Sequence, residues 1–292
     1  MRLPDCAGVQ RIARRSFLAG AASTALTPPL RAADAPVSFG LTPVFLESDL
    51  QLLSRLETYL SGRLNSPVSL IKRRTYQEIT ALLLSSQIDA AWICGYPFVQ
   101  HPDRLALVAV PVYHGQPLYQ SYLIVRHTST AQTVRDLRGG AHAFSDPDSN
   151  SGFLVTRHLL ATMGTSPSDF FSQTFFTYGH RNVVRAVASG LAESGSVDGY
   201  VWDVLQEVEP ALTAATRVLR KSELLGFPPV ACNATLKDAP RTRAIAKALV
   251  SMPEDPVGRA VLAELRLDGF TRGTPALFDG IAEKYRFVRS LT

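Results

Sequence analysis

Hydrophobic residues from position 37 onward follow two different spacings. After Leu50, leucines at positions 53, 56, 60 and 64 recur every three or four residues, which predicts one face of an α-helix. Ile88–Cys94 is almost continuously apolar, which is typical of a strand buried on both faces of a parallel sheet. The same patterns predict further strands at Val37–Leu41, Val68–Ile71, Ala106–Val110, Tyr119–Val125, Ala141–Phe144, Thr174–Thr177 and Val197–Trp202. They predict further helices at Tyr76–Leu84, Val134–Leu137, Gly152–Thr162, Val183–Ser189, Thr242–Ser251, Pro256–Leu265 and Pro275–Val288.

This strand and helix pattern occurs twice, with a restart after Val125 and no Gly/Ser-rich linker at the junction. Strand-like segments near Tyr122 and Val230 suggest that the chain crosses into a second lobe and later returns. We therefore expect an α/β fold of two lobes, each a mostly parallel sheet flanked by helices. Lobe 1 would contain residues 35–122 and 230–292, and lobe 2 residues 123–229. Ligands of such sheets bind beyond the carboxyl ends of the strands, here in the cleft between the lobes.

The first 34 of the 292 residues have the composition of an export signal rather than of a fold. Arg14-Arg15-Ser16-Phe17-Leu18 precedes a short run of small and apolar residues. Ala33-Asp34-Ala35 resembles a cleavage site, but Pro36 would follow that bond and hinder the cut, so cleavage after Ala32 or Ala33 is the alternative. The paired arginines resemble the twin-arginine consensus, which predicts export to the periplasm. An ordinary secretory signal or a membrane anchor is the alternative, although the run is shorter than the roughly 20 residues that span a bilayer.

The charge distribution changes what the basic composition implies. The chain carries a net charge of +5, but five arginines and two aspartates lie in residues 1–34, which leaves +2 for residues 35–292. The basic runs Lys72-Arg73-Arg74 and Arg220-Lys221 lack interleaved aromatic residues, so a solvated surface explains them better than a nucleic-acid interface. We expect no nucleic-acid partner.

Most catalytic and cofactor signatures are missing from the sequence. It contains no G-x-G-x-x-G, no G-x-x-x-x-G-K-[ST], no G-x-S-x-G and no H-E-x-x-H. Cys94 and Cys232 lack the spacing of a metal or haem site, and they either pair or remain two buried thiols. We therefore expect neither a metal nor a cofactor, and no enzymatic activity.

Two polar turns between a strand and a helix remain as candidate chemistry. The stretch from Asp146 to Val155 places four small polar residues at a predicted helix start, where backbone N–H groups and the helix dipole favour an anion. A simple N-cap is the alternative interpretation of these residues. Tyr178–Asn182 forms a second such turn, in which His180 could donate a hydrogen bond or lie in a surface loop.

Four segments together resemble one protein family. Asp89-Ala90-Ala91-Trp92, the run from Asp146 to Val155, Gly179-His180 and Val197-Asp198-Gly199-Tyr200 resemble the phosphonate- and phosphite-binding periplasmic proteins of ABC importers. The resemblance extends over nearly the whole chain after the signal. It implies a type II periplasmic-binding-protein fold and a phosphorus oxyanion as the ligand. The run from Asp146 to Val155 is its most specific part.

The resemblance also implies a set of ligand-binding residues. Ser149, Asn150 and Ser151 match the oxyanion turn of the family, with Asn150 in place of a central threonine. The other positions that match are His180, Asp198, Tyr76 and, displaced by one or two residues, Tyr96. Asp198 could accept a hydrogen bond from a protonated ligand oxygen or pair with an amino group. For Tyr96, packing beside Pro97-Phe98 is the alternative.

The function implied is that of a solute-binding protein for phosphonate, phosphite or phosphate. Its partners would be a small anionic ligand and an inner-membrane ABC permease, and it would act as a monomer. A type II receptor for another organic anion such as a sulfonate, a ligand-sensing subunit, and an exported enzyme on the same scaffold are the alternatives. The sequence offers no nucleophile and base pair for the last of these.

Overall fold

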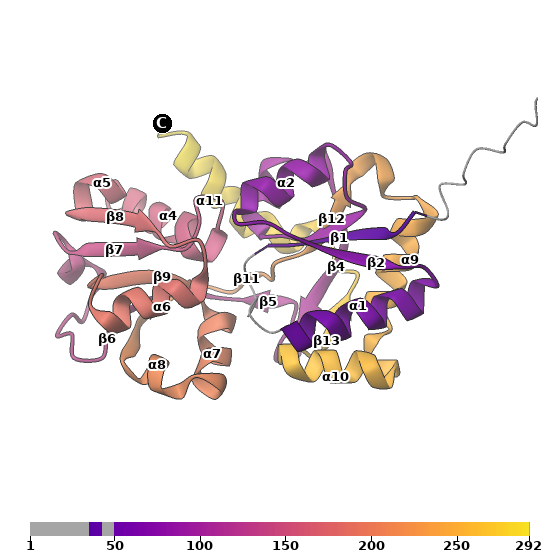
Figure 1. Cartoon of the computed structure of the whole chain (residues 1–292). Helices are drawn as coiled ribbons and strands as arrows, with labels where there is room; N and C mark the ends of the chain where they lie inside the picture. The colour runs from indigo at the N-terminus through magenta and orange to yellow at the C-terminus, as the bar shows by residue number, and fades with distance from the viewer. Residues whose placement is uncertain (1–34, 43–49, 292) are drawn as a thin grey trace, which may run out of the picture. The chain divides into compact units, whose positions relative to one another are not determined.

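The structure, a computed structural model, describes residues 35–42 and 50–291 (Figure 1). The predicted signal at residues 1–34 and its cleavage site lie outside these residues, apart from Ala35 at its end. These described residues form one compact unit built on two large β-sheets. We call the part around the six-stranded sheet the first lobe and the part around the five-stranded sheet the second lobe.

The first lobe contains strands from both ends of the described chain. Its sheet has the order β13 (Gly269–Thr271), β4 (Leu105–Val112), β12 (Val230–Asn233), β3 (Ala90–Trp92), β1 (Val37–Leu41) and β2 (Val68–Lys72). Pairing directions show that β1, β2, β3 and β4 run one way, and that β12 and β13 run the other. Helices α1 (Leu50–Leu64) and α10 (Pro256–Leu265) lie below the sheet in Figure 1, and α2 (Tyr76–Leu84) lies above it. Helix α9 (Pro240–Val250) packs against α1 and β4.

The second lobe has the order β10 (Thr216–Lys221), β6 (Ser121–Arg126), β9 (Ser194–Asp198), β7 (Ala141–Phe144) and β8 (Gln173–Phe176). Of these strands, β6 runs antiparallel to both neighbours, and the other four share one direction. The helices of this lobe are α4 (Val155–Thr162), α5 (Pro167–Phe170), α6 (His180–Ser189), α7 (Gly199–Val208) and α8 (Pro210–Ala214). Each sheet therefore combines a parallel majority with one or two reversed strands, as predicted.

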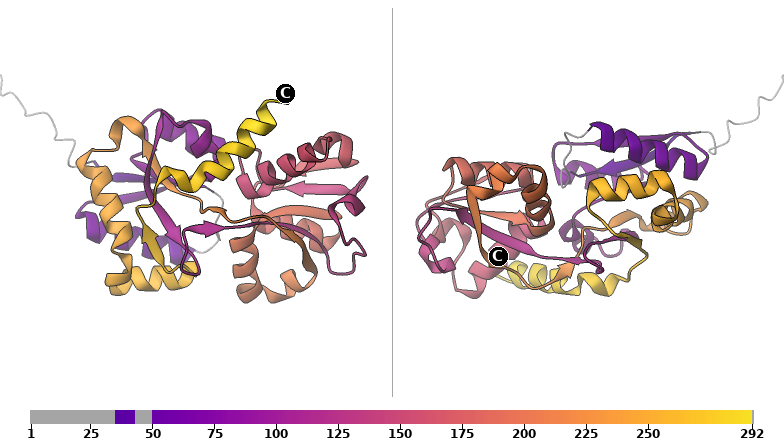
Figure 2. Two further views of the ribbon diagram at one scale, coloured as in Figure 1. Left: turned by 180° about the vertical axis from the view of Figure 1, so that it is seen from behind. Right: turned by 90° about the horizontal axis from the view of Figure 1, so that it is seen from below.

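Two short strands and one helix connect the lobes. β5 (Leu118–Tyr119) pairs antiparallel with β11 (Leu225–Gly226) where the chain passes between the sheets. Helix α11 (Asp279–Arg289) contacts α3 (Gly95–Gln100) in the first lobe and α4 in the second, and Figure 2 shows it extending from one lobe to the other. The Tyr200 hydroxyl donates to the Leu265 carbonyl over 2.5 Å, which adds a further tie. The lobe boundaries near residues 122 and 230 stay a prediction.

Several predicted elements are confirmed to the residue because local capping fixes their ends. Helix α2 begins after Thr75, whose hydroxyl accepts from the Glu78 N–H while the Glu78 carboxylate accepts from the Thr75 N–H, a capping box. Helix α10 begins after Asp255, which accepts from two backbone N–H groups, and it ends at Arg266 in the left-handed region at φ 55°. The predicted bounds of β1 and β7 are confirmed as well.

Other predictions were wrong at their ends. The predicted strand Val197–Trp202 stops at Asp198, and helix α7 begins at Gly199 because the Asp198 carboxylate accepts from the Val201 N–H at 3.3 Å. The predicted strand Tyr119–Val125 is divided into β5 and β6. The predicted helix Gly152–Thr162 starts two residues early, as a π-helical turn over Asn150–Leu154.

None of the helices in residues 50–291 is long and apolar enough to cross a membrane. Cys94 and Cys232 are free, buried thiols, so the alternative of a disulfide between them does not hold. A buried histidine lies in the core of the second lobe. His142 lies between the hydroxyls of Ser194 and Ser196, at 2.7 and 2.9 Å, and its ring stacks on Phe171 with centroids 4.3 Å apart.

Acid should destabilise the second lobe through His142. Burial lowers its pKa to about 3, whereas an unfolded histidine titrates near 6.5. Between these values the unfolded chain binds more protons, so the free energy of unfolding falls as the pH falls below about 6.5. In urea unfolding between pH 7 and 5, His142→Gln should make the free energy of unfolding less dependent on pH. The slope should fall by up to about 1.4 kcal/mol per pH unit, which corresponds to one proton taken up on unfolding. His127→Gln, at an exposed position, is the control; equal slopes in wild type and His142→Gln would contradict this prediction.

Candidate ligand-binding site

The turn after strand β7 brings three consecutive buried polar residues to the junction of the lobes. Ser149, Asn150 and Ser151 are at most 1% exposed. Ser149 caps the π-helical turn, since its Oγ accepts from the Gly152 N–H at 2.9 Å. The Ser121 hydroxyl of β6 donates to the Ser151 carbonyl at 2.6 Å, which ties the turn to the sheet. The N-cap and the candidate anion turn are therefore the same structure.

Gly152 is required by close packing at this turn. A Cβ atom built on it would lie 1.8 Å from Ser145 Oγ and 2.9 Å from Ser149 Oγ. The Ser145 N–H also donates to the Gly152 carbonyl at 3.2 Å, so the two segments are in direct backbone contact. Any side chain at position 152 would displace the turn.

A histidine and a tyrosine meet across the two lobes. Tyr76, the first residue of α2, has its hydroxyl 3.2 Å from His180 Nε2, at the start of α6. His180 Nδ1 accepts from the Asp198 N–H at 3.1 Å, which leaves the ring proton on Nε2. Burial lowers the pKa of His180 to about 3, so at pH 7 the ring is neutral and donates through Nε2.

Two carboxyl groups lie in the same region, and burial raises the pKa of both. Asp198 has its pKa raised to about 8, and it is therefore mostly protonated at pH 7. Asp146 has its pKa raised to about 6, against the lowering effect of the Asp148 and Tyr76 N–H groups that it accepts from at 2.8 and 3.3 Å. At pH 7 Asp198 therefore adds little negative charge to the site, whereas Asp146, whose pKa lies below 7, is mostly ionised.

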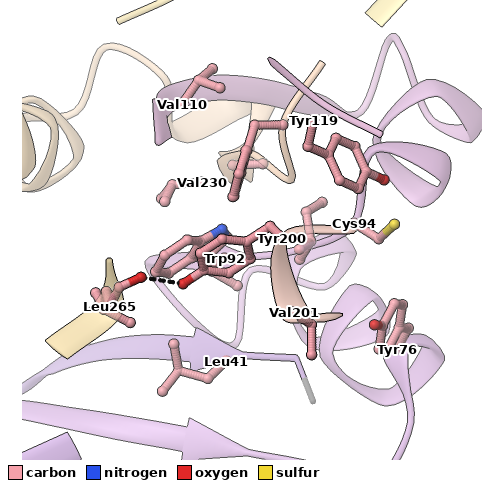
Figure 3. Packing of buried hydrophobic residues seen from close by; sticks show 14 of the residues in the cluster. Leu41, Tyr76, Trp92, Cys94, Val110, Tyr119, Tyr200, Val201, Val230 and Leu265 are labelled. Carbon is pink, nitrogen blue, oxygen red and sulfur yellow. Dashed lines mark hydrogen bonds between the residues drawn. The ribbon is translucent and has the colours of Figure 1, made fainter. Parts of the chain in front are cut away.

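Asn150 contacts two residues that the sequence did not indicate. Its backbone N–H donates to Cys94 Sγ at 3.1 Å, and its Nδ2 donates to the Tyr119 hydroxyl at 2.9 Å. Burial raises the pKa of the Cys94 thiol to about 12, which keeps it protonated. In Figure 3, Tyr76, Cys94 and Tyr119 lie at the edge of the buried cluster that contains Trp92 and Tyr200.

Three polar atoms of this turn have no hydrogen-bond partner within the described part of the chain. They are Ser145 Oγ, Asn150 Oδ1 and Ser151 Oγ, and each is buried. Native proteins leave few buried polar groups without a hydrogen bond, and a bound ligand is one reason for such groups. Their concentration at one turn indicates that a polar group from outside the chain completes the site.

The structure brings together most of the predicted residues. Tyr76, Asn150, Ser151, His180 and Asp198 are buried around the junction, with Ser149 as the cap of the turn. Tyr96 is placed differently: its ring packs against Tyr285 of α11, with centroids 5.6 Å apart.

The tyrosine that contacts the Asn150 side chain is Tyr119, in the segment where the chain crosses between the lobes. In the sequence, only its position in that crossing segment could have indicated that it lies near the site. The described residues include no group of three or more His, Cys, Asp or Glu side chains suited to a metal.

Comparison with known proteins identifies the family. Residues 39–278 match the model of the family described as "ABC transporter, phosphonate, periplasmic substrate-binding protein". The chain belongs to this family. The resemblance first seen in four short segments is thereby confirmed, and the role of members as substrate-binding components of importers applies to this chain.

Solved structures support the same fold. A binding protein component of an ABC phosphonate transporter from Pseudomonas aeruginosa has a TM-score of 0.79 at 20% identity, over 88% of this chain and 87% of that one. A protein from Prochlorococcus marinus in complex with methylphosphonate has a TM-score of 0.76 at 16% identity, over 87% and 98%. The alkanesulfonate-binding protein of Xanthomonas axonopodis pv. citri, bound to MOPS, has a TM-score of 0.54 at 19% identity, over 86% and 84%. The predicted type II two-lobed fold is confirmed.

Gly152→Ala should disrupt the turn, because its Cβ would overlap Ser145 Oγ. We expect a loss of about 2–4 kcal/mol of unfolding free energy, or a displaced turn that no longer binds ligand. Gly62→Ala is the matched control, since a Cβ there meets nothing within 4 Å in helix α1, and it should stabilise the protein by about 0.5–1 kcal/mol. Urea unfolding of both variants measures the difference; equal stabilities would show that the turn adapts.

Proposed function

We propose that this protein captures a phosphorus oxyanion (phosphonate, phosphite or phosphate) between its lobes and delivers it to an inner-membrane ABC permease. The observation that supports the ligand class most directly is the buried turn at Ser149–Ser151, where Asn150 Oδ1 and Ser151 Oγ lack hydrogen-bond partners within the described chain. Residues from both lobes surround that turn: Tyr76 and Cys94 from the first, and His180 and Asp198 from the second.

The proposed ligand is held by neutral groups rather than by cations. His180 offers Nε2–H, Tyr76 and Ser151 offer hydroxyls, and the starts of α6 and α7 face the same region. Pre-aimed neutral donors stabilise an anion in a buried site without the desolvation cost of a charged side chain. A sulfonate would meet the same donors, and it is the alternative ligand class.

Lobe closure follows from ligand contacts that exist in one arrangement only. The Tyr76–His180 and Asn150–Cys94 hydrogen bonds cross between the lobes, so residues of both lobes contact a ligand at the turn only when the lobes are closed. Tyr119 and Cys94 join the seven residues predicted from sequence as proposed ligand neighbours. The involvement of Tyr96 remains a prediction.

Three further aspects of the proposal rest on the sequence. We propose export by the twin-arginine route, from the Arg14-Arg15 motif. We propose that the protein acts as a monomer, as the family resemblance implies. We propose no nucleic-acid partner, since residues 35–292 carry a net charge of only +2. Cleavage of the signal, measured by mass spectrometry of the exported protein, would locate the start of the mature chain.

Titration calorimetry should find a phosphorus oxyanion that binds more tightly than ~1 mM among phosphite, methylphosphonate, 2-aminoethylphosphonate and phosphate. His180→Ala and Ser149→Ala should each weaken that ligand about 10- to 100-fold, since a charge-assisted hydrogen bond contributes about 1.5–3 kcal/mol. His127→Ala and Ser172→Ala, at exposed positions, serve as controls. Binding of a sulfonate or nitrate with no response to any phosphorus oxyanion would refute the phosphorus assignment.

Ligand should also protect Cys94 from alkylation. The thiol is buried against the Asn150 N–H in the closed arrangement, and opening of the lobes would expose it. In a Cys232→Ser variant, where Cys94 is the one thiol left in residues 35–292, saturating methylphosphonate should slow labelling by iodoacetamide at least about tenfold. Labelling at an unchanged rate would argue that closure is independent of the ligand.

A further inference from the structure

The unpaired oxygen of Asn150 sets a chemical requirement on the ligand. Asn150 is fully buried, and its Oδ1 has no partner within the described residues. Its donor groups bond elsewhere, the backbone N–H to Cys94 Sγ and Nδ2 to the Tyr119 hydroxyl. A carbonyl oxygen can only accept a hydrogen bond. An anion whose oxygens are all acceptors therefore leaves Oδ1 unsatisfied, and it places two lone pairs against each other.

The neighbouring groups do not supply the missing donor. Tyr119 bonds the Nδ2 end of the Asn150 amide, not the Oδ1 end. The hydroxyl of Ser151, the next residue, forms no hydrogen bond to Oδ1 either. The His180 proton lies on Nε2, directed toward the Tyr76 hydroxyl. The donor for Asn150 must then come from the bound molecule.

We propose that Asn150 Oδ1 accepts a hydrogen bond from a hydroxyl group on the bound oxyanion, and that Asn150 is thereby a specificity-determining residue. The inference rests on the proposed function. The ligand class is a singly protonated phosphorus oxyanion, which carries a P–OH group beside its anionic oxygens. A sulfonate has the same tetrahedral shape and a single negative charge, but it has no hydroxyl at any pH at which the protein is folded. The site rejects the sulfonate because its buried acceptor would remain unpaired.

The test compares methylphosphonate with methanesulfonate, two ligands of nearly equal size, by calorimetry at about pH 5, below the second ionisation of phosphate-like groups near 6. Wild type should bind methylphosphonate at least about 100-fold more tightly than methanesulfonate. Asn150→Thr supplies a hydroxyl that can donate as well as accept, and it should narrow the ratio about tenfold through tighter methanesulfonate binding. Gln173→Thr, at an exposed position in β8 of the same lobe, should leave the ratio unchanged.

Asn150→Leu, which has a similar shape, separates the two orientations of the amide. If Oδ1 faces the ligand, losing the acceptor weakens methylphosphonate and spares methanesulfonate, so the ratio falls. If Nδ2 faced the ligand instead, both ligands would lose a donor, the ratio would stay constant, and the proposal would be overturned.

The proposal is also overturned if the affinities of the wild-type protein for methylphosphonate and methanesulfonate differ by less than about tenfold, whatever the variants do. Failure of wild type to bind methylphosphonate, phosphite or phosphate at all is a different result, which refutes the proposed function itself and this inference with it.

Discussion

The hydrogen bond from the Asp198 backbone N–H to His180 Nδ1 fixes the chemistry of the whole site. Asp198 is the last residue of strand β9 and the N-cap of helix α7, and its N–H donates to the first residue of α6. By occupying Nδ1 it places the ring proton on Nε2, which is the atom directed at Tyr76 of the first lobe. A histidine in the other tautomer would present a lone pair there, and an anion would be repelled.

The same burial that fixes His180 explains why the Asp198 carboxyl does not oppose an anion at pH 7. Removing a carboxyl from water raises its pKa, and at Asp198 the rise to about 8 leaves the group mostly neutral at pH 7. Its carboxyl still accepts from the Val201 N–H and caps α7, so one residue ends a strand, starts a helix and fixes a histidine. A charged Asp198 would repel an anionic ligand. If water reached this carboxyl, it would stabilise the ionised form and so restore that charge.

Local signals predicted the fold well, and contacts between lobes could not be predicted from them. The capping box at Thr75 and Glu78 and the cap at Asp255 set helix starts through neighbours in sequence, so those bounds followed from the pattern. The helical start at Gly199 was missed because an apolar run through Trp202 has the same composition as a strand. Cys94 and Tyr119 contact Asn150 across 56 and 31 positions, and no spacing in the sequence reports that. The strand-turn-helix pattern indicated the polar turn and His180, and the family resemblance added Tyr96, whose ring packs on Tyr285 and whose role in binding stays a prediction.

Specificity in such a site must come from the direction of each hydrogen bond, that is, from whether the protein or the ligand donates. Charge alone does not distinguish one singly charged oxyanion from another. Residues 35–292 carry a net charge of +2, and His180 and Asp198 are mostly neutral at pH 7, so charge does little to distinguish one small anion from another. A donor such as His180 Nε2–H can bond to the oxygens of any oxyanion. A site made only of donors would therefore bind sulfonate and phosphonate equally. A fully buried acceptor changes that, since its desolvation is offset only by a ligand that brings a proton. Under the proposed function the atom in that position is Asn150 Oδ1, which cannot donate, and we ascribe the discrimination between tetrahedral anions to it.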